Sequence, residues 1–140
     1  MTNFAIDTII LEGIDKTGKD TLVQYIDRVC NHRYAIYQRG NISNIAYERI
    51  FNRQPQQYKY NMYRHALYVL LTADLEDLKI RFKLSNEPYT DIERDSIAFK
   101  TTFDDLTDGY YTAEYNTSEM TAYQIAKDIV SKVDQINNIK

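Results

Sequence analysis

Residues 11–22 read LEGIDKTGKDTL, and this stretch constrains the fold more than any other part of the chain. Gly13 and Gly18 are separated by four residues, and Lys19 follows the second glycine. Phosphate-binding loops have this spacing, because backbone N–H groups in a glycine-rich turn surround phosphate oxygens while the lysine reaches the outer phosphates. Asp20 stands where such a loop normally has a serine or threonine whose hydroxyl helps to hold Mg²⁺.

A strand and a helix are predicted on the two sides of this loop. The apolar run Thr8–Leu11 has the length of a buried strand and ends just before Gly13. From Lys19 to about His32 a helix is predicted by apolar side chains at helical spacing, namely Leu22, Ile26, Val29 and Cys30.

Strand and helix patterns alternate along the rest of the chain. Further strands are predicted at Tyr34–Gln38, Leu67–Thr72 and Tyr110–Tyr115. Apolar stripes predict helices over about 42–50, 75–82, 92–106 and 125–133. Three polar residues are predicted as N-caps of these helices: Ser43, Asp74 and Asn116. The segments 52–61 and 85–90 are predicted as loops, the first of them mobile.

This alternation predicts an α/β fold in which a parallel sheet lies between two layers of helices, with residues 1–140 in one domain. Such sheets bind ligands beyond the carboxyl ends of their strands, where the loop at residues 11–19 would lie. The net charge of −3 provides no positive field for duplex nucleic acid. A single cysteine, no apolar leader and no apolar run near 20 residues predict a cytoplasmic protein without a membrane segment.

The loop and its flanks resemble a known family. LEGIDKTGKDTL closely resembles the phosphate loop of thymidylate kinases, which typically reads Glu-Gly-x-Asp-x-x-Gly-Lys-Ser-Thr. In QRGNISNIAY (38–47), Arg39, Ser43, Ala46 and Tyr47 match that family's Asp-Arg-x-x-x-Ser-x-x-Ala-Tyr. LYVLLTADLEDLKIRF (67–82) and IERDSIAF (92–99) resemble the segments that lead into and close the family's lid. The resemblance covers most of the chain, and small phage-encoded deoxynucleoside monophosphate kinases are the nearest type.

The resemblance implies a P-loop kinase fold and the transfer of the ATP γ-phosphoryl group, with Mg²⁺, to a deoxynucleoside monophosphate, most simply one like dTMP. It implies that ATP is contacted by loop residues, namely Gly13, Asp15, Lys16, Thr17, Gly18, Lys19, Asp20 and Thr21. The cationic residues with an implied catalytic role are Lys16, Lys19, Arg39 and Arg81. The acceptor is expected to contact Glu12, Asp15, Arg39, Ser43 and Tyr47.

The chain departs from the family pattern at three places. Only a few residues separate Arg28 from Tyr34, so the segment that builds much of the family's acceptor-base pocket is missing. Lys16 occupies the position of a loop arginine, and Asp91 stands where a lid arginine would otherwise be expected. Asp20 replaces the hydroxyl while Gln38 replaces the aspartate before Arg39, which leads to the hypothesis that Asp20 ligates Mg²⁺.

Two other functions fit the same residues. The acceptor could be a deoxynucleoside or polynucleotide 5′-hydroxyl, with Glu12 or Asp15 as the base, or the chain could bind nucleotide without catalysis. ATP and a small nucleotide are the expected partners, and a homodimer is an open alternative because members of the family often dimerise.

Some residues have both a structural and a functional interpretation. Lys83 could close over the phosphates with Arg81 or be an ordinary exposed charge. An aromatic and basic cluster in QYKYNMYRH could stack on a base or pack as half-buried side chains; it contains Tyr58, Tyr60, Tyr63 and Arg64. His32 and His65 lack metal-ligand spacing and are expected to be structural.

Overall fold

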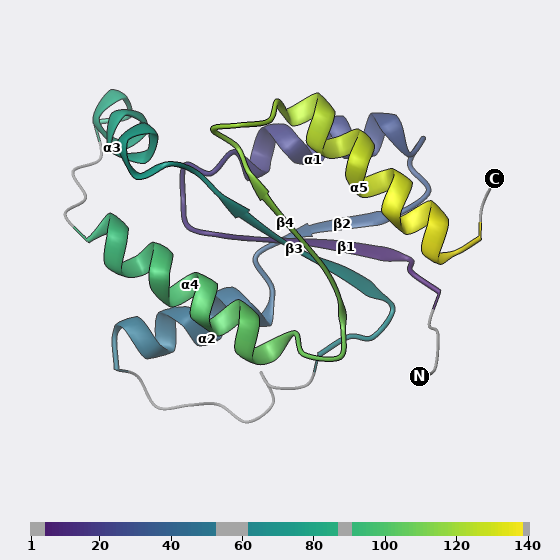
Figure 1. Ribbon diagram of the computed structural model, residues 1–140, viewed down its shortest axis with the longest axis horizontal. Helices are drawn as coiled ribbons and strands as arrows, with labels where there is room; N and C mark the ends of the chain where they lie inside the picture. Colours follow the sequence, from purple (N-terminus) through teal and green to yellow (C-terminus); the bar gives the residue numbers. More distant parts are fainter. Residues whose placement is uncertain (1–4, 53–61, 87–90, 139–140) are drawn as a thin grey trace.

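A computed structural model describes residues 5–52, 62–86 and 91–138. Four strands form one parallel sheet in the order β2-β1-β3-β4, and they are β1 (Thr8–Glu12), β2 (Ala35–Gln38), β3 (Ala66–Thr72) and β4 (Tyr111–Asn116). Five helices connect or follow them: α1 (Lys19–Val29), α2 (Asn41–Ile50), α3 (Leu75–Leu84), α4 (Ile92–Leu106) and α5 (Ala122–Ile136). The predicted α/β fold with a parallel sheet is confirmed, and β1 and β3 occupy its centre (Figure 1).

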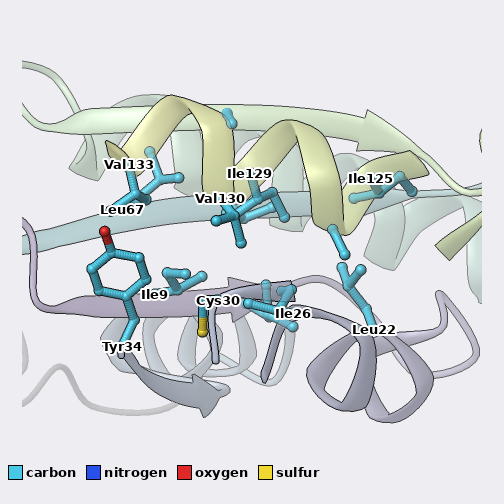
Figure 2. Packing of buried hydrophobic residues seen from close by; sticks show 14 of the residues in the cluster. Ile9, Leu22, Ile26, Cys30, Tyr34, Leu67, Ile125, Ile129, Val130 and Val133 are labelled. Atoms are coloured by element: carbon cyan, nitrogen blue, oxygen red, sulfur yellow. The ribbon is translucent and has the colours of Figure 1, made fainter. Parts of the chain in front are cut away.

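Helices cover both faces of the sheet (Figure 1). On one face α1 and α5 pack side chains such as Ile26 and Ile129 against Ile9 and Leu67 (Figure 2). On the other face Tyr68, at the next position of β3, packs in a separate cluster with residues of α2 and α4. Because side chains of a strand alternate between faces, a continuous apolar run is what a strand buried on both faces requires.

The third helix closes the carboxyl end of the sheet. α3 follows β3 directly, and its Leu78 and Phe82 pack with Ile14 of the phosphate loop and with Phe99 of α4. Leu78 and Phe82 are the buried part of the predicted stripe. No helix among the described residues is both long enough and apolar enough to span a membrane.

Of the three predicted N-caps, the position of Asp74 is confirmed, whereas Ser43 and Asn116 are not the observed caps. Ser43 lies inside α2, whose N-cap is Gly40, because its hydroxyl donates to the buried carboxylate of Glu12. Asp74 does occupy the N-cap position of α3, but its side chain makes no cap hydrogen bond and instead accepts one from Asn116. Asn116 ends β4, and a capping box formed by Thr121 and Gln124 begins α5.

The first helix is shorter than predicted. α1 ends at Val29 rather than near His32, because Asn31 and His32 both adopt left-handed backbone conformations, with φ values of 52° and 60°. The predicted loop at 52–61 falls almost entirely outside the described residues. The break after Ser85 matches the C-cap of α3.

Candidate active site: two cavities around the phosphate loop

The loop between β1 and α1 needs glycine at its first position. Gly13 has φ 142°, and a Cβ atom placed there would lie 2.5 Å from the carbonyl oxygen of Leu71 on the neighbouring strand. Gly18, with φ 97°, is the N-cap residue of α1. The two glycines therefore allow the chain to leave β1, pass close to β3 and enter α1 with its first N–H groups directed at the loop.

Lys19 is folded back into this loop. Its Nζ donates to the carbonyl oxygens of Gly13 and Ile14, both at 2.7 Å, and its side chain is almost fully buried. Burial lowers the Lys19 pKa to about 8, although the carboxylates of Glu12 and Asp20 act in the opposite direction. The ammonium group is thus held at the centre of the loop, partly desolvated, where an anionic ligand would replace the carbonyl contacts.

Glu12 is buried and connects the end of β1 to α2, so its side chain does not face a cavity. Its carboxylate is fully buried and accepts hydrogen bonds from the Gly40 backbone, the Ser43 backbone and the Ser43 hydroxyl, at 2.7–3.1 Å. Burial raises the pKa of Glu12 against the effect of these hydrogen bonds. The contacts tie the end of β1 to the first turn of α2, so the structure gives both Glu12 and Ser43 a buried connecting role.

Arg39 and Asp15 form an ion pair on the other side of the loop. Each side chain is 47% exposed, so both groups remain in contact with solvent. Arg39 directly follows β2 and has a left-handed backbone with φ 61°, while its N–H donates to Leu11 of β1. A non-glycine residue in this conformation costs of order 1–3 kcal/mol, and the surrounding hydrogen bonds must hold it there.

The amide of Gln38 donates to Asp20 Oδ1 at 2.8 Å. Gln38 is the last residue of β2, and Asp20 lies in the first turn of α1. Both side chains are exposed. The contact holds Asp20, the acidic residue in the first turn of α1, beside Lys19. Burial lowers the Lys19 pKa, and the Asp20 carboxylate opposes this effect.

A polar cavity of about 500 Å³ collects most of the predicted site residues. It is lined by Asp15, Lys16, Gly18, Lys19, Asp20, Thr21, Gln38 and Arg39. Three cations and two carboxylates leave one net positive charge, which suits a phosphate-bearing ligand.

A second, more apolar cavity of about 380 Å³ lies on the other side of the loop. Lys16, Thr17, Gly18 and Thr21 of the loop line it together with Met120 and Ile125 near the start of α5. Arg81 forms a wall of this cavity, since its Nη1 donates to the Lys16 carbonyl at 2.8 Å and to Thr117 Oγ1 at 3.2 Å. The two cavities share Lys16, Gly18 and Thr21, so the loop separates two adjoining compartments.

Three further residues with an expected or possible site role have different surroundings. Tyr47 is half-buried between Phe99 and Phe51, with ring centroids 5.3 and 6.0 Å away. Lys16 lines both cavities, but its Nζ lies 5.9 Å from the centroid of the Phe82 ring. Lys83 is exposed in the last turn of α3 and lines neither cavity.

The described residues of the aromatic and basic cluster, Tyr63 and Arg64, lie at the edge of the sheet away from the phosphate loop. Tyr63 and Arg64 precede β3, so they lie at the amino ends of the parallel strands, opposite the phosphate loop. The Tyr63 hydroxyl donates to Asp7, and the Arg64 guanidinium stacks 4.4 Å from the Tyr110 ring centroid. Their role in the described structure is packing, and Tyr58 and Tyr60 lie outside the described residues.

The turn after β4 contributes residues that sequence reasoning missed. Thr117 and Met120 line the apolar cavity, and Thr117 is positioned by its backbone N–H, which donates to Thr72 at the end of β3. The sequence did contain an indication of this role, because these residues follow the carboxyl end of a predicted strand, as the phosphate loop follows β1. Ligands of parallel sheets bind beyond that end of the strands.

Solved structures share the fold that carries these cavities. The YorR protein of Bacillus subtilis, solved in complex with phosphorylated GDP, superposes with a TM-score of 0.75 at 20% identity, covering 91% of this chain and 95% of YorR. Thymidylate kinase from Candida albicans superposes with a TM-score of 0.66 at 15% identity, covering 99% of this chain and 96% of the enzyme.

The chain has the thymidylate kinase fold. The resemblance carried by LEGIDKTGKDTL is therefore confirmed at the level of the fold. No family model matches the sequence, and no curated protein matches it either.

Proposed function

We propose that this protein is a nucleoside monophosphate kinase that uses ATP and Mg²⁺ and transfers the γ-phosphoryl group to a deoxynucleoside monophosphate, most simply one like dTMP. The observation that carries this proposal is the pair of cavities that adjoin across one phosphate loop, the apolar one sized for a nucleoside and the polar one positively charged. YorR, solved with phosphorylated GDP, supports nucleotide binding by this fold.

The two substrates are assigned to the two cavities by their chemistry. The base and sugar of ATP would occupy the apolar cavity beside Arg81 and Met120, and its phosphates would follow the loop backbone towards Lys19. The acceptor phosphate would bind Arg39 in the polar cavity, replacing the Asp15 carboxylate as its partner. Transfer breaks the bond between the γ-phosphorus and the β–γ bridging oxygen and forms one to an acceptor phosphate oxygen, giving ADP and a nucleoside diphosphate.

The residues of the polar cavity fit Mg²⁺. Asp20 offers a carboxylate and Thr21 a hydroxyl, which are hard oxygen donors of the kind that Mg²⁺ prefers. In the proposed complex, Asp20 would share the ion with water and the nucleotide phosphates. The chemistry that Mg²⁺ supplies when bound is neutralisation of charge on the transferred phosphoryl group.

A hydroxyl acceptor is the second candidate, and the position of Asp15 favours it. Of the two carboxylates that could act as base, Glu12 is buried and bonded to α2, whereas Asp15 is half-exposed in the polar cavity. In that reaction the hydroxyl proton would pass to Asp15 as the new P–O bond forms.

The test is a coupled assay of ADP release with ATP and Mg²⁺. The acceptor panel contains the four deoxynucleoside monophosphates, the deoxynucleosides and an oligonucleotide with a 5′-hydroxyl. Lys19→Ala should abolish turnover, while Lys79→Ala is a matched control because Lys79 pairs with Glu76 on the surface of α3.

Turnover of one monophosphate that depends on Lys19 supports the proposal and identifies the acceptor. Turnover of a hydroxyl acceptor alone selects the second candidate. ATP binding without any turnover would make the chain a nucleotide-binding protein that lacks catalysis.

A further inference from the structure

The contact between Asp20 and Gln38 joins two elements at the polar cavity. Gln38 Nε2 donates to Asp20 Oδ1 at 2.8 Å, from the end of β2 to the start of α1, and both residues line the cavity. Neither side chain is buried, so the contact is not needed to fill the core.

The geometry of this contact restrains one carboxylate oxygen and leaves the other available. Within residues 5–52, 62–86 and 91–138, no hydrogen bond to Asp20 Oδ2 is found. An unrestrained aspartate in the first turn of a helix could rotate into solvent, whereas the amide of Gln38 keeps it beside the loop.

The chemical types at the two positions are exchanged relative to the motifs that the chain resembles. Those motifs carry a hydroxyl where Asp20 stands and a carboxylate where Gln38 stands, so both arrangements contain one carboxylate and one neutral hydrogen-bond donor. The net charge of the cavity is therefore the same in either arrangement.

We infer that Gln38 is a positioning residue that holds Asp20 for a nucleotide-bound divalent cation, and that the two residues work as one exchangeable unit. This inference rests on the proposed function, because it requires that the loop binds a nucleotide with Mg²⁺.

The experiment measures the affinity for ATP by calorimetry, with excess Mg²⁺ and with EDTA, and the ratio of the two dissociation constants is the readout. Five proteins are compared: wild type, D20S, Q38L, Q38D and the double variant D20S/Q38D. Mn²⁺ binding in the presence of ATP, followed by electron paramagnetic resonance, gives a second readout that does not depend on turnover. Thermal unfolding of each variant verifies that it is folded, as expected for two exposed positions.

The wild type should bind ATP more tightly with Mg²⁺, and D20S should lose this gain. Q38L keeps the carboxylate but removes its amide partner. The gain in ATP affinity that Mg²⁺ provides should be about tenfold smaller in Q38L than in the wild type, the size expected for groups that orient a metal ligand. Q38D places two carboxylates together and should weaken ATP binding in EDTA, while D20S/Q38D should recover most of the wild-type gain.

Two results would overturn the inference. If Q38L retains the full Mg²⁺ gain, Asp20 acts without Gln38, and if D20S/Q38D binds Mn²⁺ no better than D20S, the two residues are not a unit. If the wild type binds ATP in neither condition, the proposed function itself fails, and this result is distinct from the other two.

Discussion

At the scale of single residues, the site contains groups whose backbone conformation or burial costs free energy. Lys19 is desolvated, Arg39 and Lys16 have left-handed backbones, and Gly13 occupies a space that no side chain can enter. Strained and desolvated groups persist only where the surrounding structure determines them, and they concentrate at functional sites. This cost supports the proposal that the loop is the functional site.

The pH dependence of ATP binding should follow Lys19. Burial lowers its pKa to about 8 in the free protein, so the ammonium that attracts phosphate is lost above that pH. We expect kcat/KM for ATP to fall about tenfold per pH unit above pH 8, whereas kcat should decline only at higher pH because bound phosphate stabilises the charged lysine. The measurement is a profile of kcat/KM from pH 7 to 9.5. Lys79→Ala, which changes a lysine on the surface of α3, should give the wild-type profile, and a flat wild-type profile would contradict the prediction.

The same pKa shift has a definite effect on stability. The Lys19 pKa in the folded chain lies below its ordinary value of 10.5, so the unfolded chain binds more protons between pH 8 and 10.5. The Lys19 contribution to the free energy of unfolding therefore rises with pH across this window.

Gly13→Ala should damage both stability and binding. A Cβ atom would lie 2.5 Å from the Leu71 carbonyl oxygen, so the loop must move, at a cost of roughly 1–3 kcal/mol. Gly109→Ala is a matched control, since Gly109 also has a positive φ, of 82°, but open space around the added atom. Urea unfolding and ATP binding should show a large loss in both for Gly13→Ala and a loss of stability alone for Gly109→Ala.

At the scale of elements, the ends of strands and the starts of helices form the walls of the two cavities. β1 leads into the loop, β2 ends at Gln38 beside Arg39, and β4 leads into the turn that carries Thr117 and Met120. Because the strands are parallel, all three of these segments meet at the same edge of the sheet (Figure 1).

Arg81→Met distinguishes a structural wall from a catalytic cation. Arg81 joins α3 to the loop and to the turn after β4, and it does not line the polar cavity. Methionine keeps the unbranched stem of the arginine side chain but removes the guanidinium and both of its hydrogen bonds, so KM for ATP should rise about tenfold with little change in kcat. The measurement is steady-state kinetics. A fall in kcat with an unchanged KM would instead support the catalytic role that the sequence predicts for Arg81.

The capping box of α5 should be measurable in stability. The Thr121 hydroxyl accepts from the Gln124 N–H, and the Gln124 side chain accepts from the Thr121 N–H. Thr121→Ala should lower the free energy of unfolding by about 1 kcal/mol, as is typical for loss of an N-cap. Thr101→Ala, at an exposed position inside α4, should cause no loss in the same urea titration, and equal losses would contradict the assignment.

At the scale of the whole molecule, the sheet and its two helix layers form a rigid base for the loop. Ile9, Leu11 and Leu67 are buried beneath α1 and α5, so the strand ends that carry the site are fixed by the core (Figure 2). Such burial contributes on the order of 1.5–3 kcal/mol for each large apolar side chain.

ATP with Mg²⁺ should therefore stabilise the entire folded chain. A ligand at 100 times its dissociation constant contributes about 2.7 kcal/mol, which for a chain of this size raises the unfolding midpoint by roughly 6–10 °C. Differential scanning fluorimetry should show this shift for the wild type and for Lys79→Ala, but not for Lys19→Ala. An equal shift in Lys19→Ala would place the nucleotide away from the loop.

The sequence by itself determined the α/β fold, the order of its elements and the position of the phosphate loop. These features depend on local patterns, since apolar periodicity and glycine spacing act over a few neighbouring residues. Most residues of the polar cavity were expected from the resemblance to thymidylate kinase motifs, which match the loop and Arg39 position by position.

Only the tertiary structure decided which side chains face the cavities and which connect the elements behind them. Glu12 and Ser43 matched a family motif but bond to each other in the interior, and Arg81 forms a wall of the apolar cavity. The contact of Asp20 with Gln38 joins positions 18 residues apart, and Thr117 lines the apolar cavity together with Lys16 and Gly18 of the loop. Such contacts depend on strand pairing and helix packing over long sequence separations, which local periodicity does not encode.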